Sequence, residues 1–332
     1  MTDRLAPTHV LYRAAAGPRI GFGHLVRCRS LARAMGEHPI TSIRGDAPTK
    51  RTAATLGWAV VNGGCRSALE TMCPDALVVD DPSPRSAASW VRTAQAMGVP
   101  VATIHDLGMA YVSSDLSIDG TFQPGVGRNG RFGDLRGTGF AILDPAVVVA
   151  SSSPRPDRVL IALGGGEHAR QFAGSLAAAI ASRAPQADIR VAAGFVAAAD
   201  HPRLPKGRWF FAPDGLSHAL ADATVVVSAG GVTMYEACAI GRATVGIALT
   251  PEQDIALSAA ARHGAVIHAG AVGAAGTATH VADHVARLID SASARASLVQ
   301  AGRRLVDGRG AFRVADWLRE LVAFRRGLNH AA

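Results

Sequence analysis

VVVSAGGVTMYEACAIG, residues 225–241, is the stretch that decides the fold. Its three valines predict a buried strand, Gly230 and Gly231 predict a turn, and residues 233–240 predict a helix. Glycines remove side chains where the backbone must turn and come close to a ligand. Free N–H groups at a helix start then favour an anion such as a diphosphate. The stretch therefore predicts a strand–turn–helix unit with an anion site at its turn.

Glu236 follows Thr233 by three residues, and this spacing has two interpretations. The carboxylate can accept hydrogen bonds from the two hydroxyls of a ribose. Alternatively, Thr233 is the N-cap and Glu236 the third helical residue of a capping box, which needs no ligand. A motif this short does not decide between them. Ser228 and the two glycines before the helix, with a second glycine-rich turn far upstream, favour the ligand.

Composition restricts the class of protein. With 332 residues, the chain is long enough for two domains of ordinary size. Hydrophobic residues make up 48% and charged residues 18%, which is typical of a globular chain and excludes a disordered one. The apolar runs are far shorter than the ~20 residues of a membrane span, and the first residues lack the apolar core of a signal peptide. We therefore expect a cytoplasmic protein without a transmembrane segment.

The cysteines and the net charge bear on two further classes of protein, those with disulfides or zinc and those that bind nucleic acid. Four scattered cysteines form no CxxC pair, so neither a disulfide framework nor a zinc site is expected. The net charge of +8 is compatible with a nucleic-acid-binding protein. However, the basic residues are almost all arginines, since Lys50 and Lys206 are the only lysines, and they are spread along the chain. This distribution argues against nucleic acid, and a positive field also suits an anionic substrate.

Short β-rich runs alternate with helical stretches, which predicts βαβ units and mostly parallel sheets. In the first half, the expected strands are residues 9–13, 40–44, 76–80, 100–104 and 140–143, and the expected helices are residues 24–35 and 85–97. In the second half, the expected strands are residues 158–163, 188–193, 209–211, 224–228 and 244–248. The expected helices there are residues 168–182, 233–240, 253–263, 279–291 and 311–324.

Each half opens with a strand, a glycine-rich turn and a helix, and a polar segment with two prolines at residues 151–156 separates them. We therefore predict an α/β protein with two Rossmann-like domains facing each other across a cleft. The domains are expected at residues 1–150 and 157–310, with residues 311–332 forming a C-terminal helix that packs back on the first domain. Ligands of such sheets bind beyond the carboxyl ends of the strands, where the glycine-rich turns lie.

The N-terminal turn carries the strongest candidate for acid–base chemistry. Gly21 and Gly23 make a tight turn, and His24 then stands at a helix start. A helix N-terminus disfavours added positive charge, so it favours the neutral imidazole that a general base requires. A lone histidine at a helix start is otherwise a surface residue, but the G-x-G-H-x-x-R context favours a functional one.

The segment IGFGHLVRCRSLARAM, residues 20–35, resembles the opening signature of a family of sugar-nucleotide enzymes. They are the hydrolases that remove UDP from a diacetamido-trideoxy sugar in pseudaminic acid synthesis, and related proteins of spore-coat polysaccharide synthesis. The resemblance implies the GT-B fold, shared with the GlcNAc transferase of peptidoglycan synthesis. It runs from Tyr12 to about Ala260 and includes ALVVDD (76–81), IHDL (104–107), SSDLSIDG (113–120), GFAILDP (139–145), ALGGGE (162–167), SAGGVTMYEACAIG (228–241) and PEQ (251–253).

The resemblance also implies roles for individual residues. His24 matches the histidine that activates the attacking water, and Glu236 the glutamate that holds the ribose of UDP. Gln253 matches a glutamine on the sugar side of the donor. The residues predicted to bind the nucleotide-sugar are Arg13, Gly21, Gly23, Gly164, Gly165, Gly166, Ser228, Gly230, Gly231, Thr233, Glu236 and Gln253. The predicted catalytic residues are His24 and Asp80, and we expect neither a metal site nor a cofactor.

Several positions depart from the family pattern. Ala15 stands where the first strand usually brings an aspartate, and Glu252 stands where an asparagine usually precedes Gln253. Asp80 is kept, but Asp81-Pro82-Ser83-Pro84 replaces a segment that usually contains a tyrosine. These changes fall where the sugar or acceptor is expected, so the resemblance supports nucleotide binding better than it supports the family's substrate.

Four functions therefore remain open. The first is a GT-B glycosyltransferase of sugar, secondary-metabolite or surface-glycan biosynthesis, with a UDP-sugar donor, an unidentified acceptor and His24 as general base. The second is a UDP-sugar hydrolase, in which water replaces the acceptor. The third is a nucleotide-sugar-binding protein without activity, and the fourth a nucleic-acid-binding protein. The sequence favours the transferase.

Overall fold

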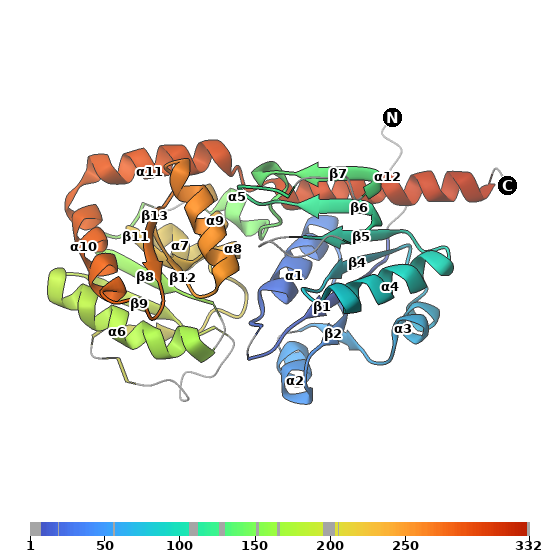
Figure 1. The fold of residues 1–332 in the computed structure, drawn as a ribbon, viewed down its shortest axis with the longest axis horizontal. Coiled ribbons are helices and arrows are strands. Elements are labelled where there is room, and N and C mark those ends of the chain that lie inside the picture. Colours follow the sequence, from blue (N-terminus) through green and yellow to red (C-terminus); the bar gives the residue numbers. More distant parts are fainter. Residues whose placement is uncertain are drawn as a thin grey trace. The chain divides into compact units, whose positions relative to one another are not determined.

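The computed structural model describes residues 8–18, 20–55, 57–105, 112–125, 130–150, 153–164, 167–194, 203–204 and 206–330, without the side chains of residues 167–170 and 328–330. The chain divides into two compact units, each a sheet with helices packed on it (Figure 1). Unit 1 comprises Met1–Gly17, His24–Pro145 and Arg309–Ala332, and unit 2 comprises Pro18–Gly23 and Ala146–Gly308.

Unit 1 is built on a seven-stranded parallel sheet in the order β3-β2-β1-β4-β5-β6-β7. The strands are β1 (Val10–Ala15), β2 (Ile40–Arg44), β3 (Ala59–Val61), β4 (Ala76–Asp80), β5 (Val101–Ile104), β6 (Ser114–Asp119) and β7 (Gly130–Arg136). The helices are α1 (Gly23–Met35), α2 (Ala47–Thr55), α3 (Cys65–Met72), α4 (Pro84–Ala96), the short η1 (Thr138–Phe140) and α12 (Gly310–His330).

Unit 2 is built on a six-stranded parallel sheet in the order β10-β9-β8-β11-β12-β13. The strands are β8 (Arg158–Ala162), β9 (Asp188–Ala192), β10 (Arg208–Phe210), β11 (Val225–Ala229), β12 (Ala243–Ala248) and β13 (Ile267–Ala271). The helices are α5 (Ala146–Val149), α6 (Glu167–Arg183), α7 (Ser217–Asp222), α8 (Val232–Ile240), α9 (Pro251–Arg262), α10 (Thr277–Asp290) and α11 (Ala292–Leu305).

Alternate residues of β11 reach the two faces of the unit 2 sheet. Val225 and Val227 join the core formed with α6 and α10, whereas Val226 joins the core formed with α5, α7 and α8. All three valines are fully buried. A strand buried on both faces is typical of a parallel sheet covered by helices, and this explains why the run VVV identifies it in the sequence.

Each sheet reverses its direction of winding once, and the two reversals place the glycine-rich turns. In unit 1 the reversal lies between the neighbours β1 and β4, and in unit 2 between β8 and β11. Turns that leave the carboxyl ends of two such strands diverge to opposite faces and leave a crevice, which is where α/β sheets bind ligands. We therefore expect such a crevice at the carboxyl ends of β1 and β4 in unit 1 and of β8 and β11 in unit 2. The predicted α/β class with two Rossmann-like domains is confirmed.

The strand predicted at residues 140–143 is wrong. Phe140 is the last residue of η1, residues 141–143 follow it without forming a strand, and the edge of the sheet is β7 instead. Ala141 is enclosed by backbone: a Cβ added at Gly120 would lie 2.6 Å from its Cα, and one added at Gly310 would lie 2.6 Å from its nitrogen. The apolar residues 141–143 are therefore buried by tertiary packing, which the sequence pattern does not distinguish from strand pairing.

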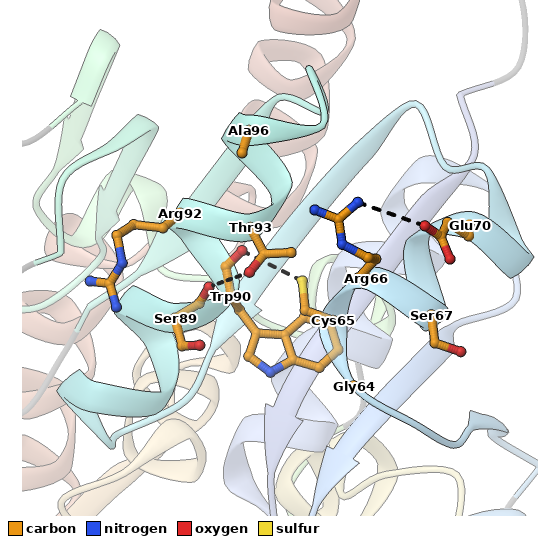
Figure 2. Close-up of a pocket in the computed structure, with 10 residues that line it drawn as sticks. All are labelled: Gly64, Cys65, Arg66, Ser67, Glu70, Ser89, Trp90, Arg92, Thr93 and Ala96. Atoms are coloured by element: carbon orange, nitrogen blue, oxygen red, sulfur yellow. Dashed lines mark hydrogen bonds and ion pairs between the residues drawn. The ribbon is translucent and has the colours of Figure 1, made fainter.

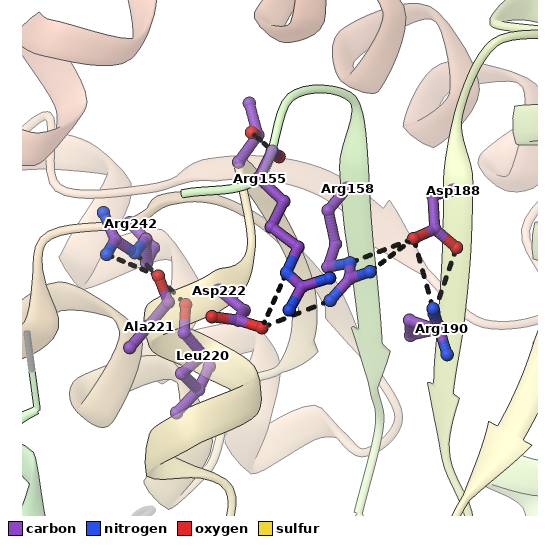
Figure 3. A network of polar contacts seen from close by, with 9 residues as sticks. Arg155, Arg158, Asp188, Arg190, Leu220, Ala221, Asp222 and Arg242 are labelled. Carbon is purple, nitrogen blue, oxygen red and sulfur yellow. Dashed lines mark hydrogen bonds and ion pairs between the residues drawn. The ribbon is translucent and has the colours of Figure 1, made fainter. Parts of the chain in front are cut away.

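The amino ends of the unit 2 strands are joined by an arginine–aspartate network (Figure 3). Arg158 of β8 lies 2.6 Å from Asp188 of β9 and 3.2 Å from Asp222 of α7, and Arg190 lies 3.0 Å from Asp188. Arg155 lies 3.3 Å from Asp222, and its carbonyl accepts a hydrogen bond from Thr224. The network therefore anchors residue 155, which precedes β8, to unit 2.

Among the residues that the structure describes, no helix combines the length and apolarity needed to cross a bilayer.

Replacement of glycine by alanine is expected to have opposite effects on stability at two positions of α12. Gly310→Ala would place a Cβ against the backbone of Ala141, whereas Gly327→Ala meets nothing within 4 Å. We expect Gly310→Ala to lower the free energy of unfolding by about 3 kcal/mol through overpacking. Gly327→Ala should raise it by up to ~1 kcal/mol, since alanine favours an exposed helix. Chemical denaturation measures both, and equal effects would contradict the packing of α12 on unit 1.

Candidate functional site

His24 and Asp80 meet at the crevice of unit 1. Gly21, with a φ of +79°, makes the turn before α1, and His24 is the second residue of that helix. Asp80 is the last residue of β4 and pairs with Ala14 of β1 in the sheet. The His24 Nδ1 atom lies 2.7 Å from Asp80 Oδ1, a hydrogen-bond distance. The two predicted catalytic residues are therefore in contact, although 56 positions separate them in the sequence.

Arg27 completes this cluster from the same helix face. Its Nε donates to Asp80 Oδ2 at 2.7 Å and its Nη2 donates to Asp80 Oδ1 at 2.6 Å. Such a bidentate pair is the strongest form of arginine–carboxylate contact. The sequence did not single out Arg27 as a site residue, but its spacing of three from His24, which places both side chains on one helix face, was a usable signal.

The cluster fixes which nitrogen of His24 carries a proton. Asp80 is fully buried, and burial alone would raise its pKa, but the Arg27 guanidinium and His24 outweigh burial and hold the pKa of Asp80 well below its usual range. An ionised carboxylate only accepts hydrogen bonds, so Nδ1 of His24 must be the donor. Neutral His24 therefore has its lone pair on Nε2, the nitrogen that can act as a base.

Arg13 lies in a second polar cluster, next to Asp81. Its Nε lies 3.6 Å from Asp81 Oδ2, and its guanidinium stacks 4.6 Å from the ring centre of Trp90. Asp81 also accepts two hydrogen bonds of 2.9 Å from Arg44 and one of 2.7 Å from Ser86. These contacts are all within unit 1. Arg13 therefore has a structural role, because it connects β1 to Asp81 and Trp90. Its predicted role in binding the nucleotide-sugar stays a prediction.

The start of α8 in unit 2 is open to a ligand. Gly231 is the N-cap, no side chain caps the helix, and a Cβ added at Gly231 would meet nothing within 4 Å. Gly230 is needed for packing, since its Cβ would lie 2.6 Å from the carbonyl oxygen of Gln253. A glycine N-cap has no side chain to accept from the N–H groups of the first turn, and helix starts of this kind are the ones that bind phosphates.

The capping-box interpretation of Thr233 and Glu236 is wrong. α8 begins at Val232, one residue before the predicted start, so Thr233 is the second helical residue and Glu236 the fifth. The capping role of this pair is excluded because the cap is Gly231. Glu236 is buried, with 6% of its surface exposed. Its predicted contact with a ribose stays a prediction.

Ser228 has an unusual environment. It is fully buried near the carboxyl end of β11, between Ala162 of β8 and Gly246 of β12. Its Oγ has no hydrogen-bond partner among the described residues. A buried hydroxyl without a partner costs free energy that a polar group of a ligand can recover. Ser228 lies three residues before the N-cap of α8, so it marks the same turn.

The remaining predicted residues of unit 2 have mixed environments. Gly164 follows β8 with a φ of +94° and open space around it, while Gly165 and Gly166 lie outside the described residues. The Gln253 side-chain oxygen accepts the backbone N–H of Leu249 at 3.0 Å, and Thr250 caps α9. The Gln253 side chain thus binds the backbone that leads into α9. The sequence did not predict this local contact.

A groove on unit 1 includes Trp90, the residue on which Arg13 stacks. It has a volume of about 770 Å³ and is lined by α3 and α4 (Figure 2). Trp90 and Cys65 are buried at its base, and Arg66 and Glu70 are exposed along it. None of the predicted site residues lines this groove. Within the described ranges, no group of three or more His, Cys, Asp or Glu residues is placed to hold a metal ion.

No family model and no curated protein matches the sequence. Solved structures share its fold. The spinosyn forosaminyltransferase SpnP is 17% identical, with 96% of this chain and 100% of that chain covered and a TM-score of 0.66. MurG of Acinetobacter baumannii is 13% identical (94% and 99% covered, TM-score 0.60), and the spinosyn rhamnosyltransferase SpnG, complexed with thymidine diphosphate, is 15% identical (94% and 99%, TM-score 0.56). The chain therefore has the GT-B fold.

Ser228 predicts a stabilising substitution. Ser228→Ala removes a buried hydroxyl that has no partner in the described part of the chain, so we expect the free energy of unfolding to rise by about 1 kcal/mol. Ser114→Ala is the matched control: Ser114 is equally buried on β6, but its hydroxyl contacts Leu116 and Thr103 at 2.9 and 2.7 Å. We expect that variant to lose about 1–2 kcal/mol. If denaturation shows both variants destabilised, the environment assigned to Ser228 is incorrect.

Proposed function

We propose that the protein is a GT-B glycosyltransferase that uses a nucleotide-sugar donor, with His24 as the general base. The observation that carries the proposal is the hydrogen bond between His24 and the buried, ionised Asp80 at the crevice of unit 1. A carboxylate that holds one nitrogen of an imidazole protonated leaves the other nitrogen as a base of fixed orientation. Asp80 is then the orienting partner and His24 the residue that meets the acceptor.

The donor site proposed for unit 2 is the turn between β11 and α8. The start of α8, with its glycine N-cap, offers N–H groups to a diphosphate. The buried Ser228, whose hydroxyl has no partner among the described residues, lies next to the same turn. Glu236 would hold the ribose, as the sequence resemblance implies. UDP is the proposed nucleotide on the same ground, while thymidine diphosphate, which is bound in the SpnG structure, is the alternative nucleotide to test.

The proposed reaction is a displacement at the anomeric carbon of the donor sugar. His24 Nε2 takes the proton of an acceptor hydroxyl, and the acceptor oxygen forms a bond to the anomeric carbon. The bond between that carbon and the diphosphate oxygen breaks, and its electron pair leaves with the diphosphate. Helix N–H groups stabilise the negative charge that develops there. The products are the glycosylated acceptor, the nucleoside diphosphate and protonated His24.

A second candidate is hydrolysis, in which water replaces the acceptor. The observation that favours it is the resemblance of residues 20–35 to the UDP-sugar hydrolases. Ala15 and the segment from Asp81 to Pro84 depart from the pattern of those hydrolases in the part of the sequence expected to meet the sugar or acceptor. We therefore place the transferase first.

Turnover of nucleotide-sugars by the purified protein tests the proposal. Wild type, His24→Ala and the control His38→Ala, an exposed histidine beyond α1, are incubated with pooled UDP- and TDP-sugars, with and without a mixture of acceptor alcohols. Mass spectrometry follows the products. We expect wild type and His38→Ala to release the nucleoside diphosphate when an acceptor is present, and His24→Ala to be slower by about 10²–10⁴-fold.

Nucleotide binding is measured in the same samples by thermal shift. UDP should raise the melting temperature of all three proteins, because the donor site does not include His24. Free sugar released without an acceptor would identify the hydrolase. Unimpaired turnover by His24→Ala would exclude His24 as the base. A shift with UDP but no turnover of any donor with any acceptor would favour a binding protein, and the absence of both would refute the nucleotide-sugar proposal.

A further inference from the structure

Arg27 lies against both members of the His24–Asp80 pair. It donates two hydrogen bonds to Asp80, and its Nη2 lies 3.3 Å from His24 Nδ1. Nδ1 already donates to Asp80, so this last contact joins two donors and is not a hydrogen bond. It places a permanent positive charge beside the imidazole ring.

We propose that Arg27 is a positioning residue that keeps His24 in the neutral state by taking up the charge of Asp80. The inference rests on the proposed function, in which His24 is the base. A carboxylate alone beside a histidine favours the imidazolium form, and an imidazolium cannot accept a proton. Arg27 opposes this effect, so that Asp80 orients the ring without protonating it.

The distances show that the two opposite charges act on His24 at comparable range. Asp80 Oδ1 lies 2.7 Å and Arg27 Nη2 lies 3.3 Å from the same atom, His24 Nδ1. The side chains of Arg27 and Asp80 are 9% and 0% exposed, so water screens neither charge well. If His24 took up a second proton, its positive charge would be attracted by Asp80 and repelled by Arg27. At these distances the two effects largely cancel.

Two other ionisable residues of the described part of the chain lie next to the cluster, Cys28 and Asp81, and neither carries a positive charge. The charges that act on Asp80 come from Arg27 and His24, both on α1. The Cys28 thiol, on the same helix, is fully buried; burial, together with Asp80, raises its pKa well above the usual value, so it stays uncharged. Asp81, the residue after β4, is paired with Arg44 and Arg13 in its own cluster.

The test is the protonation of His24 itself, followed by NMR. The Cε1–Hε1 signal of His24, assigned by its absence from His24→Ala, is titrated in wild type and in Arg27→Gln, whose amide can still donate to Asp80. We expect the midpoint of the titration to rise by about 1–3 pH units in Arg27→Gln, because Asp80 then acts on His24 unopposed. Arg27→Lys, which keeps the charge, should return the midpoint toward that of wild type.

Arg33→Met is the matched control. Arg33 lies on the same helix and pairs with Asp144 at 2.5 Å, away from His24. We expect its substitution to leave the His24 midpoint unchanged. An unchanged or lowered midpoint in Arg27→Gln would overturn the inference, as would an equal rise in Arg33→Met.

If Arg27→Gln does not fold, a second pair of variants tests the inference, in which Asp80 is also neutralised. Asp80→Asn should lower the His24 midpoint, since Arg27 is then unopposed, and the Asp80→Asn/Arg27→Gln double variant should raise it again. Both variants leave no uncompensated buried carboxylate. Equal midpoints in the two variants would show that Arg27 has no effect on His24.

Activity separates this inference from the proposed function. If His24 is the base, the acid limb of the kcat/KM profile in Arg27→Gln moves to higher pH together with the NMR midpoint, and full activity returns at high pH. If the midpoint moves but the rate profile does not, the inference about Arg27 stands and the role of His24 in catalysis fails.

Discussion

Both units depend on one constraint, which is that a parallel sheet must be covered by helices on both faces. The faces are therefore mainly apolar, and the polar residues discussed above lie at the two ends of the strands. At the carboxyl ends lie His24 with Asp80 in unit 1 and Ser228 in unit 2. At the amino ends of unit 2 lie Arg158 and Asp188, which tie strands together. The sheet thus separates the residues proposed for chemistry from residues that anchor the chain.

Several arginines, which supply most of the positive charge of the chain, bind the carboxyl ends of helices. Arginine side chains donate to the last carbonyl groups of helices, where the helix dipole is negative and the backbone lacks partners. The arginines that do so, each with the helix that it caps, are Arg319 on α1, Arg242 on α7, Arg303 on α8 and Arg295 on α10. The contacts of Arg319, Arg242 and Arg303 run between segments more than 20 residues apart in the sequence, whereas those of Arg295 are local. Guanidinium groups bound in this way are not available to a phosphate backbone, which weakens the case for nucleic acid.

The spacing of apolar residues predicted the strands and helices that carry a clear apolar run or apolar face of their own. The valines of β11 and the apolar face of α1 identify a strand and a helix without knowledge of any partner. Residues 140–143 show the limit, because their burial comes from Gly120 and Gly310, which only the fold brings to Ala141. The same limit applies to the site. The glycine turn before His24 and the spacing of three between His24 and Arg27 are visible in the sequence, whereas the contact of both residues with Asp80 depends on strand order.

The two crevices carry different parts of the proposed reaction. A general base must come within hydrogen-bond reach of the acceptor, and charge on the leaving diphosphate must be stabilised at the same moment. The residues suited to the first task are in unit 1 and those suited to the second are in unit 2. The departures at Ala15 and Asp81 fall in unit 1, while the turn from Ser228 to Gly231 keeps its pattern. On the proposed function, specificity for the acceptor therefore resides in unit 1 and can vary without loss of the donor site.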